Sequence, residues 1–219
     1  MIITIDGPAG VGKTTIGIKL TQTLNSTSKK TFYFLDTGLL YRLVAINYEK
    51  LDRFNIADLI QFEDFRKEIN YEEKYSFLYT EEVAVKTSKI SQIKEVREKI
   101  NDEIRKKVKT TKAKHDCGFI FTGRDCGTVI FPEADYKFYL YASPYERAKR
   151  RIKQYEKLGK PQDLNQILHS IIQRDEEDSK RQIAPLPTIH NLPKDFIIII
   201  SDNLTIEQTV QKFLEYIKI

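Results

Sequence analysis

The residues with the most specific chemistry form a glycine-rich loop near the start of the chain. Residues 7–14 read Gly-Pro-Ala-Gly-Val-Gly-Lys-Thr, between an apolar run at 1–6 and a segment with the apolar spacing of a helix. Glycines let the backbone curl so that its N–H groups point at phosphate oxygens, and the positive end of the following helix adds attraction. In this context the pattern predicts a nucleoside triphosphate site rather than a chance glycine-rich turn.

Two side chains of this loop have particular chemistry. The Lys13 ammonium is a mobile cation for the β- and γ-phosphates, and the Thr14 hydroxyl is the expected metal ligand, with Mg²⁺ as the metal. The expected cofactors are therefore ATP and Mg²⁺. The residues expected to bind the nucleotide are Gly7, Pro8, Ala9, Gly10, Val11, Gly12, Lys13, Thr14 and Thr15.

Two groups of polar residues follow later apolar runs. Thr37 suits a helix start, which is another backbone end that favours anions, and Arg42 follows about one turn later. Arg124 and Asp125 lie just beyond the third apolar run. Because open α/β sheets bind ligands at the carboxyl ends of their strands, we expect these side chains in the same crevice as the glycine loop.

A third group consists of Arg174, Asp178 and Arg181. Their spacing predicts that all three share one face of a single helix. Arginine and aspartate at such spacing are usually solvated surface pairs. The group therefore indicates a binding site only in combination with the glycine loop.

The elements that must position these groups alternate along the chain. Short apolar runs separate longer segments with helical spacing, which is typical of an α/β fold with a parallel sheet and crossover helices. Helix starts are marked at Ser143–Glu146 and Thr205–Gln208, and a helix is expected at about Lys13–Leu24. The predicted strands, apolar throughout as in strands buried on both faces, are Ile2–Ile5, Phe32–Leu35, Phe119–Phe121, Phe138–Tyr141 and Phe196–Ile200.

The alternation breaks between the second and third predicted strands. This stretch predicts an acidic helical segment near Asp58–Ile69, a short strand at Tyr75–Tyr79 and a long charged helical region from about Glu81 to Lys112. We interpret it as an insertion on the substrate side of a single domain. Residues 157–163 are polar, separate two basic helices and predict the tip of a mobile flap.

Composition limits the class of protein. The chain has 219 residues and a net charge of +5, with eleven Lys or Arg against four Asp or Glu between Lys86 and Lys114. Few aromatic residues interleave these charges, so basic groups that face polyphosphate substrates explain them better than a nucleic-acid-binding module does.

The longest apolar run is five residues, too short for a bilayer. Two cysteines and no basic leader favour a cytoplasmic protein without a disulfide framework.

Several stretches together resemble the bacterial-type cytidylate kinase family, a branch of the nucleoside monophosphate kinases. They occur in the family's order and at near-family spacing along the whole chain. The resemblance implies a P-loop fold with a five-stranded parallel sheet, and it implies transfer of a phosphoryl group from ATP to CMP or dCMP. The matching stretches are residues 5–15, Leu35–Gly38 with Tyr41–Arg42, Ser88 with Val96–Glu98, Gly123–Pro132, Glu146–Arg151, and Arg174–Asp175 with Asp178 and Arg181–Leu186.

The resemblance also implies a division of the chain and of its site. The core would comprise residues 1–41, 116–146 and 182–219, with a reduced NMP-binding insertion at about 42–115 and a lid at about 147–181. The acceptor phosphate would contact Thr37, Arg42, Arg124 and Arg181, the cytosine Ser88, Arg97 and Asp125, and the ribose Arg174 and Asp178. The residues implied to neutralise charge during transfer are Lys13, Arg124, Arg147, Arg151 and Arg181, and the lid helix also carries Arg150.

This chain departs from the family pattern in its compressed insertion. Leu78-Tyr79-Thr80 stands where the family carries an Ile-Arg pair, and Cys126 replaces a residue that is commonly aliphatic. Two alternatives therefore stay open: a kinase of the same architecture that acts on another nucleotide or small acceptor, and a regulatory paralogue that binds nucleotide without turnover. We expect a monomer whose partners are small molecules, with no nucleic acid or membrane among them.

Overall fold

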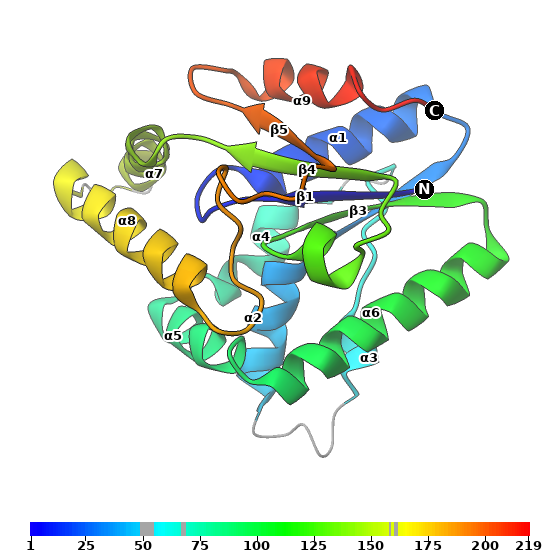
Figure 1. Cartoon of the computed structure of the whole chain (residues 1–219), viewed down its shortest axis with the longest axis horizontal. Helices are drawn as coiled ribbons and strands as arrows, with labels where there is room; N and C mark the ends of the chain where they lie inside the picture. Colours follow the sequence, from blue (N-terminus) through cyan, green and yellow to red (C-terminus); the bar gives the residue numbers. More distant parts are fainter. Residues whose placement is uncertain (49–54, 67–68, 158, 160–161) are drawn as a thin grey trace.

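The computed structural model describes residues 1–48, 55–66, 69–157, 159 and 162–219. Its centre is a five-stranded parallel sheet with the order β2-β3-β1-β4-β5 (Figure 1). All five predicted strands are confirmed within a residue or two at each end. They are β1 (Ile2–Asp6), β2 (Thr31–Asp36), β3 (Cys117–Gly123), β4 (Tyr136–Tyr141) and β5 (Phe196–Ile200).

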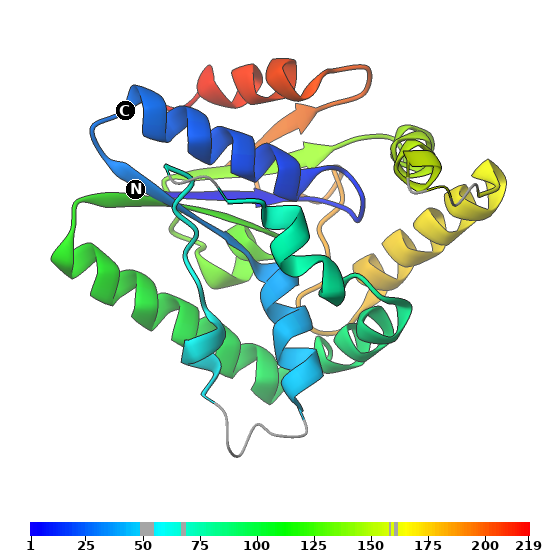
Figure 2. The ribbon, with the colours of Figure 1, turned by 180° about the vertical axis from the view of Figure 1, so that it is seen from behind.

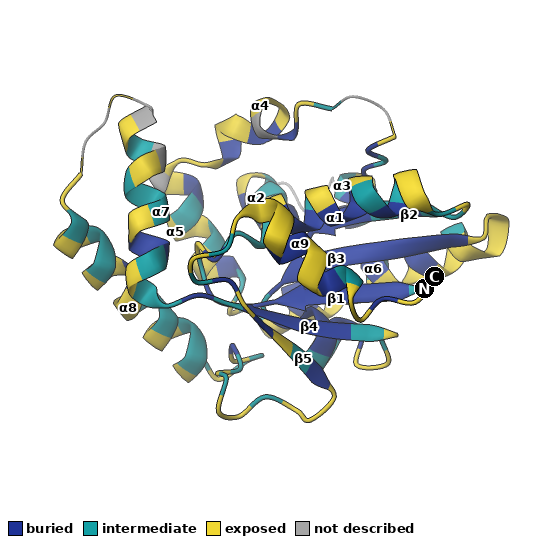
Figure 3. Ribbon diagram, turned by 90° about the horizontal axis from the view of Figure 1, so that it is seen from above, coloured by how far each residue is buried: buried dark blue, intermediate teal, exposed yellow. Residues whose placement is uncertain are grey.

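Helices cover both faces of this sheet. On one face α1 (Lys13–Thr27) and α9 (Ile206–Leu214) pack with Leu24 and Phe213 in the core, and on the other α2 (Thr37–Asn47) and α6 (Lys94–Lys114) pack with Leu40 and Ile104 (Figure 1). The central strands are buried throughout, as a sheet with two covered faces requires (Figure 3). The edge strand β5 differs from the expectation, because Ile198 and Ile200 are exposed.

The stretch between β2 and β3 is less regular than predicted. The prediction of an acidic helical segment near Asp58–Ile69 is wrong. The helix α3 spans only Ile56–Leu59, and the backbone of Glu63 then pairs with that of Phe34 in the edge strand β2. Residues 67–68 lie outside the described part. The short strand at 75–79 is also wrong, because α4 (Tyr71–Tyr75) continues into the 3-10 turn η2 (Ser76–Leu78). Figure 2 shows this stretch as the cyan trace that leaves α3.

The long charged region from about Glu81 to Lys112 is helical, as predicted, but it consists of two helices. α5 (Glu81–Ile90) ends at Ser91, and α6 begins at Lys94. α5 packs against α2, which carries Arg42. The acceptor side of the predicted site is therefore built on a pair of helices outside the sheet.

The C-terminal half contains α7 (Pro144–Lys157) and α8 (Leu164–Lys180), which pack against each other. The Ser143 hydroxyl accepts a hydrogen bond from the Glu146 N–H at 3.3 Å, and Thr205 forms a full capping box with Gln208. Three of the seven residues of the predicted flap tip, 158 and 160–161, lie outside the described residues. Among the described helices, none combines the length and the apolar character that a bilayer crossing requires.

Candidate active site

The glycine-rich loop joins β1, the central strand, to α1. Gly10 and Gly12 have φ angles of 73° and 99°, in the left-handed region that favours glycine. Gly7 approaches β4 so closely that a Cβ there would lie 2.2 Å from the Leu140 carbonyl oxygen. The glycine spacing thus serves both the curl of the loop and its packing on the sheet.

Three basic side chains hold the loop by its carbonyl oxygens. Lys13 Nζ donates to the oxygens of Gly7 at 2.9 Å and Pro8 at 2.8 Å. Arg147 Nη1 donates to Ala9 O at 2.9 Å, and Arg150 Nη1 donates to Val11 O at 3.0 Å. Lys13 therefore rests on its own loop, within reach of the place where the motif predicts phosphates.

Removal from water and, second, the nearby Arg124 guanidinium lower the pKa of Lys13 to about 7. A polyphosphate beside Lys13 favours the charged ammonium, so we expect ATP binding to take up close to one proton at about pH 8, where free Lys13 is mostly neutral. Near pH 6, where Lys13 is already charged, the uptake from this group should vanish. Calorimetric titration of MgATP in buffers of different ionisation enthalpy measures this proton count. Equal uptake by Lys13→Met would contradict the assignment.

Two carboxylates at strand ends lie near Lys13, and the sequence motifs did not single them out. Asp36, at the end of β2, accepts from the Thr14 hydroxyl at 2.5 Å and caps α2 through the Leu39 N–H. Asp6, at the end of β1, is fully buried, and burial raises its pKa to about 6. It accepts from the backbone N–H groups of Cys126 at 2.8 Å and Gly127 at 2.7 Å. An acid at the last position of a buried strand is the signal that could have found both.

The Thr14–Asp36 pair fits a magnesium ion in the donor atoms that it offers. Mg²⁺ prefers hard oxygen ligands, and it takes only one or two from the protein besides phosphates and water. Within the described residues, no cluster of three His, Cys, Asp or Glu side chains forms a separate metal centre. The Thr14 hydroxyl and the Asp36 carboxylate are thus the oxygen pair that could hold the metal beside the glycine loop.

Several arginines converge opposite the loop. Arg124 forms an ion pair with Asp178, and Arg181 Nη1 lies 4.0 Å from the other oxygen of that carboxylate. Burial and then the Arg174 and Arg181 guanidiniums lower the pKa of Arg124. Burial and then Arg42 and Arg151 do the same for Arg174. Such mutual lowering marks a concentration of positive charge, which is the electrostatic requirement of a site for anions.

Arg181 lies one residue beyond the helix on which it was predicted. It is the C-cap of α8 with extended backbone, so the three residues do not share one helical face. Its Nε donates to Ala184 O at 2.5 Å, and its buried Nη2 has no partner. The unsatisfied guanidinium N–H in this cationic cluster is a donor available to a bound anion.

A second buried group lies next to the arginine cluster. Arg97 of α6 and Asp125 form an ion pair, and each side chain is only 5% exposed. Arg97 lies over the Tyr41 ring, 5.2 Å from its centroid, and the Tyr41 hydroxyl is buried without a partner. Thr37 Oγ1 donates to Thr122 O at 2.9 Å. The structure thus brings together Arg97 and Asp125, two of the three residues expected at the cytosine, and adds Tyr41 beside them, whereas Thr37 bonds to the backbone of β3.

The peptide after Asp125 forms a π-helical turn, η3 (Cys126–Ile130), with the Phe131 N–H donating to Cys126 O at 2.7 Å. The Cys126 thiol is fully buried, and its Sγ lies 3.7 Å from Thr37 Oγ1. Burial raises the pKa of this thiol well above its usual range. Cys126 is therefore a small packing residue between the two halves of the site.

Other predicted residues are placed differently from their expected roles. Arg147 is 1% exposed and pairs with Asp175 of α8 as well as with the loop. These contacts support the glycine loop, and a role of Arg147 in phosphoryl transfer stays a prediction. Arg151 is half-buried beside the Tyr155 ring, and Ser88 is exposed on α5. No contact recorded for these described residues brings Ser88 to the Arg97–Asp125 pair.

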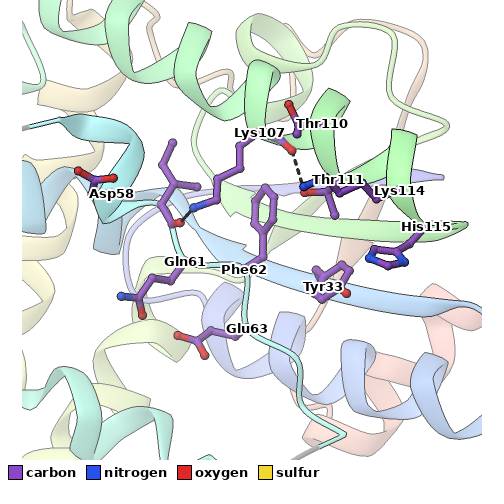
Figure 4. Close-up of a pocket in the computed structure, with 11 residues that line it drawn as sticks. Tyr33, Asp58, Gln61, Phe62, Glu63, Lys107, Thr110, Thr111, Lys114 and His115 are labelled. Carbon is purple, nitrogen blue, oxygen red and sulfur yellow. Dashed lines mark hydrogen bonds between the residues drawn. The ribbon is translucent and has the colours of Figure 1, made fainter.

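A cavity of about 510 Å³ lies elsewhere, against β2 and α6 (Figure 4). Its walls include Tyr33, Phe62 and Lys114, and Lys107 on its rim donates to Ile60 O. None of the residues of the glycine loop or the arginine cluster lines it. The cavity is therefore separate from the glycine loop and the arginine cluster.

A phosphate loop after the central strand of a parallel sheet, faced by clustered arginines, defines a nucleotide-binding protein of the P-loop kinase class. This chain belongs to the cytidylate kinase family, whose model matches residues 3–219. A cytidylate kinase of Rickettsia bellii is 35% identical over 217 residues, which cover 99% of this chain and 92% of that protein. One of Caldicellulosiruptor saccharolyticus is 36% identical over 227 residues, covering 97% and 93%.

A likeness to a solved structure concerns the fold alone. An uncharacterized protein from Eubacterium ventriosum superposes with a TM-score of 0.52 at 15% identity, over 99% of this chain and 97% of that one. It agrees with the doubly covered parallel sheet and says nothing of substrates. The family assignment rests on sequence, and the geometry of the site is this chain's own.

Proposed function

We propose that this protein transfers the γ-phosphoryl group of ATP to CMP or dCMP. The observation that carries the proposal is the placement of two consecutive residues: Arg124 lies in the cluster suited to a phosphate, and Asp125 lies in the buried pair suited to a base. One loop thereby serves both ends of a nucleoside monophosphate. The family membership agrees with this acceptor.

The base preference follows from hydrogen-bonding chemistry. Cytosine presents an amino donor at C4 and an acceptor at N3, which an Asp125 carboxylate and an Arg97 guanidinium complement. Uracil presents an oxygen at C4 and a donor at N3, so an ionised Asp125 would face an oxygen. Arg97 and Asp125 already satisfy each other, and a bound cytosine must insert its polar edge into an existing pair.

The acceptor phosphate needs no strong base, because its oxygen is anionic at neutral pH. Catalysis then depends on alignment and charge neutralisation. Arg124 and Arg181 are proposed to hold the acceptor phosphate, Arg174 and Asp178 the ribose, and Lys13 the transferred phosphoryl. Thr14 and Asp36 would hold a Mg²⁺ ion, which would supply further neutralisation of the polyphosphate charge. Closure of the 147–181 lid would exclude water, which competes as an acceptor.

A further part of the proposal concerns the cellular setting. Cys117 and Cys126 are free and buried, which agrees with a reducing compartment such as the cytoplasm. The proposed division into core, insertion and lid keeps the boundaries stated for the sequence, and the proposed acting unit is a monomer. Size-exclusion chromatography with light scattering measures the last of these.

The direct test is ADP release with MgATP and CMP, dCMP, UMP, AMP or GMP as acceptor. Strong turnover with CMP or dCMP and little with UMP is the expected result. Turnover with another acceptor only would identify a different kinase of the same architecture. ATP binding without turnover for any of the five would favour the regulatory paralogue.

Removal of the Tyr41 hydroxyl separates stability from acceptor binding. Because this buried hydroxyl has no partner, Tyr41→Phe is expected to leave the free energy of unfolding unchanged or raise it by about 1 kcal/mol. Arg97 and Asp125 are its charged neighbours, so its loss should raise KM for CMP by about threefold to tenfold. Urea unfolding and steady-state kinetics measure the two effects. A stability loss without a change in KM would contradict a role toward the acceptor.

A further inference from the structure

Two consecutive residues of the compressed insertion hold Arg42. Its Nη1 donates to the Leu78 carbonyl oxygen at 2.9 Å, and its Cζ lies 4.9 Å from the centroid of the Tyr79 ring. The carbonyl fixes one edge of the guanidinium and the ring covers one face. A guanidinium has five N–H donors in one plane, so most of them stay available for an anion.

The need for such a restraint follows from charge. Arg42 is close enough to Arg174 to lower its pKa, so the two guanidiniums repel each other across the site. Without a bound anion, an unrestrained Arg42 would lower its energy by swinging toward solvent. The negative face of an aromatic ring and a carbonyl dipole both attract the cation and oppose that movement.

Tyr79 contributes little to the hydrophobic core. Tyr79 is the C-cap of the 3-10 turn η2 and is 56% exposed, the same fraction as Phe77 within that turn. The buried residue of this turn is Leu78. The ring of Tyr79 therefore lies over the Arg42 guanidinium without being buried in the core.

We propose that Tyr79 is a positioning residue for the acceptor phosphate. Its ring, together with the Leu78 carbonyl, holds the Arg42 guanidinium at the acceptor site. Tyr79 belongs to the stretch in which the family's pattern places an arginine. The proposal rests on the proposed function, since it assumes that Arg42 contacts the acceptor. It makes Tyr79 a determinant of acceptor KM that acts through Arg42.

The test compares Tyr79→Ala, Tyr79→Leu and Tyr79→Phe with Phe77→Ala as the control of equal exposure. Tyr79→Ala and Tyr79→Leu should raise KM for CMP by about threefold to tenfold, since both remove the aromatic face, while KM for ATP and the unfolding midpoint stay unchanged. Tyr79→Phe keeps the face and should behave as wild type. Phe77→Ala should leave both KM values unchanged.

A double-mutant cycle shows whether the effect passes through Arg42. In an Arg42→Ala background, Tyr79→Ala should change KM for CMP no further. Three results would each overturn the positioning role. They are an unchanged KM for CMP in Tyr79→Ala, a rise in KM for Tyr79→Phe as large as that for Tyr79→Ala, and additive effects of the two substitutions in the cycle. Lack of CMP turnover by the wild-type protein would instead overturn the proposed function, so the two failures are distinguishable.

Discussion

Replacement of Lys13 by methionine is expected to lower kcat for phosphoryl transfer by about 100- to 1000-fold, the effect of removing one preorganised charge from a developing transition state. Methionine keeps the length of the side chain and removes the ammonium. The loss should appear mainly in kcat, because backbone N–H groups of the loop continue to bind the phosphates. Steady-state kinetics with CMP and MgATP measure it.

The structure adds a second consequence for this variant. Lys13 donates to the carbonyl oxygens of Gly7 and Pro8, so its loss also frees the loop. Lys109→Met, on an exposed position of α6, removes one charge without touching the loop and serves as the control. A Lys13→Met enzyme with wild-type kcat, or a control variant with the same loss, would contradict the assigned role.

Replacement of Asp125 by asparagine is expected to lower kcat/KM for CMP by about 100-fold or more and to reduce the preference for CMP over UMP. The reason is that both carboxylate oxygens accept hydrogen bonds, whereas the amide has one acceptor oxygen and one NH2 donor. Affinity for ATP should persist, since among the described residues Asp125 makes its ion pair with Arg97 and no hydrogen bond to the glycine loop. Kinetics with both acceptors and calorimetry with ATP measure the three quantities.

The same substitution tests the buried ion pair. Arg97 is buried and would be left without its counter-ion, so we expect a loss of about 3–5 kcal/mol in the free energy of unfolding. Asp195→Asn removes the exposed partner of Lys137 and should cost about 1 kcal/mol at most. Urea unfolding must precede the kinetics, which are then measured where both variants are folded. An equal fall in ATP and CMP affinity would show that the division of roles is wrong.

The strands were predictable because their burial depends on their own composition. A run such as Phe119–Phe121 can lie only between two covered faces, and it does. The region after β2 was not predictable in the same way. Glu63 is extended because β2 is an edge with free backbone groups, which no local pattern reveals. At 75–79 the buried positions Tyr75 and Leu78 are three apart, a helical spacing too short to distinguish from a strand.

The sequence by itself determined the phosphate loop, the α/β order and most of the residues that carry charge in the site. These follow from local physics: the glycine torsions, the apolar period and the caps each involve neighbours in the chain. Only the tertiary structure decided which charges pair. Asp178 meets Arg124 from 54 residues away, and Arg147 reaches Ala9 across 138. Ion-pair partners are selected by packing between distant elements, because any guanidinium can match any carboxylate until the fold brings two of them together.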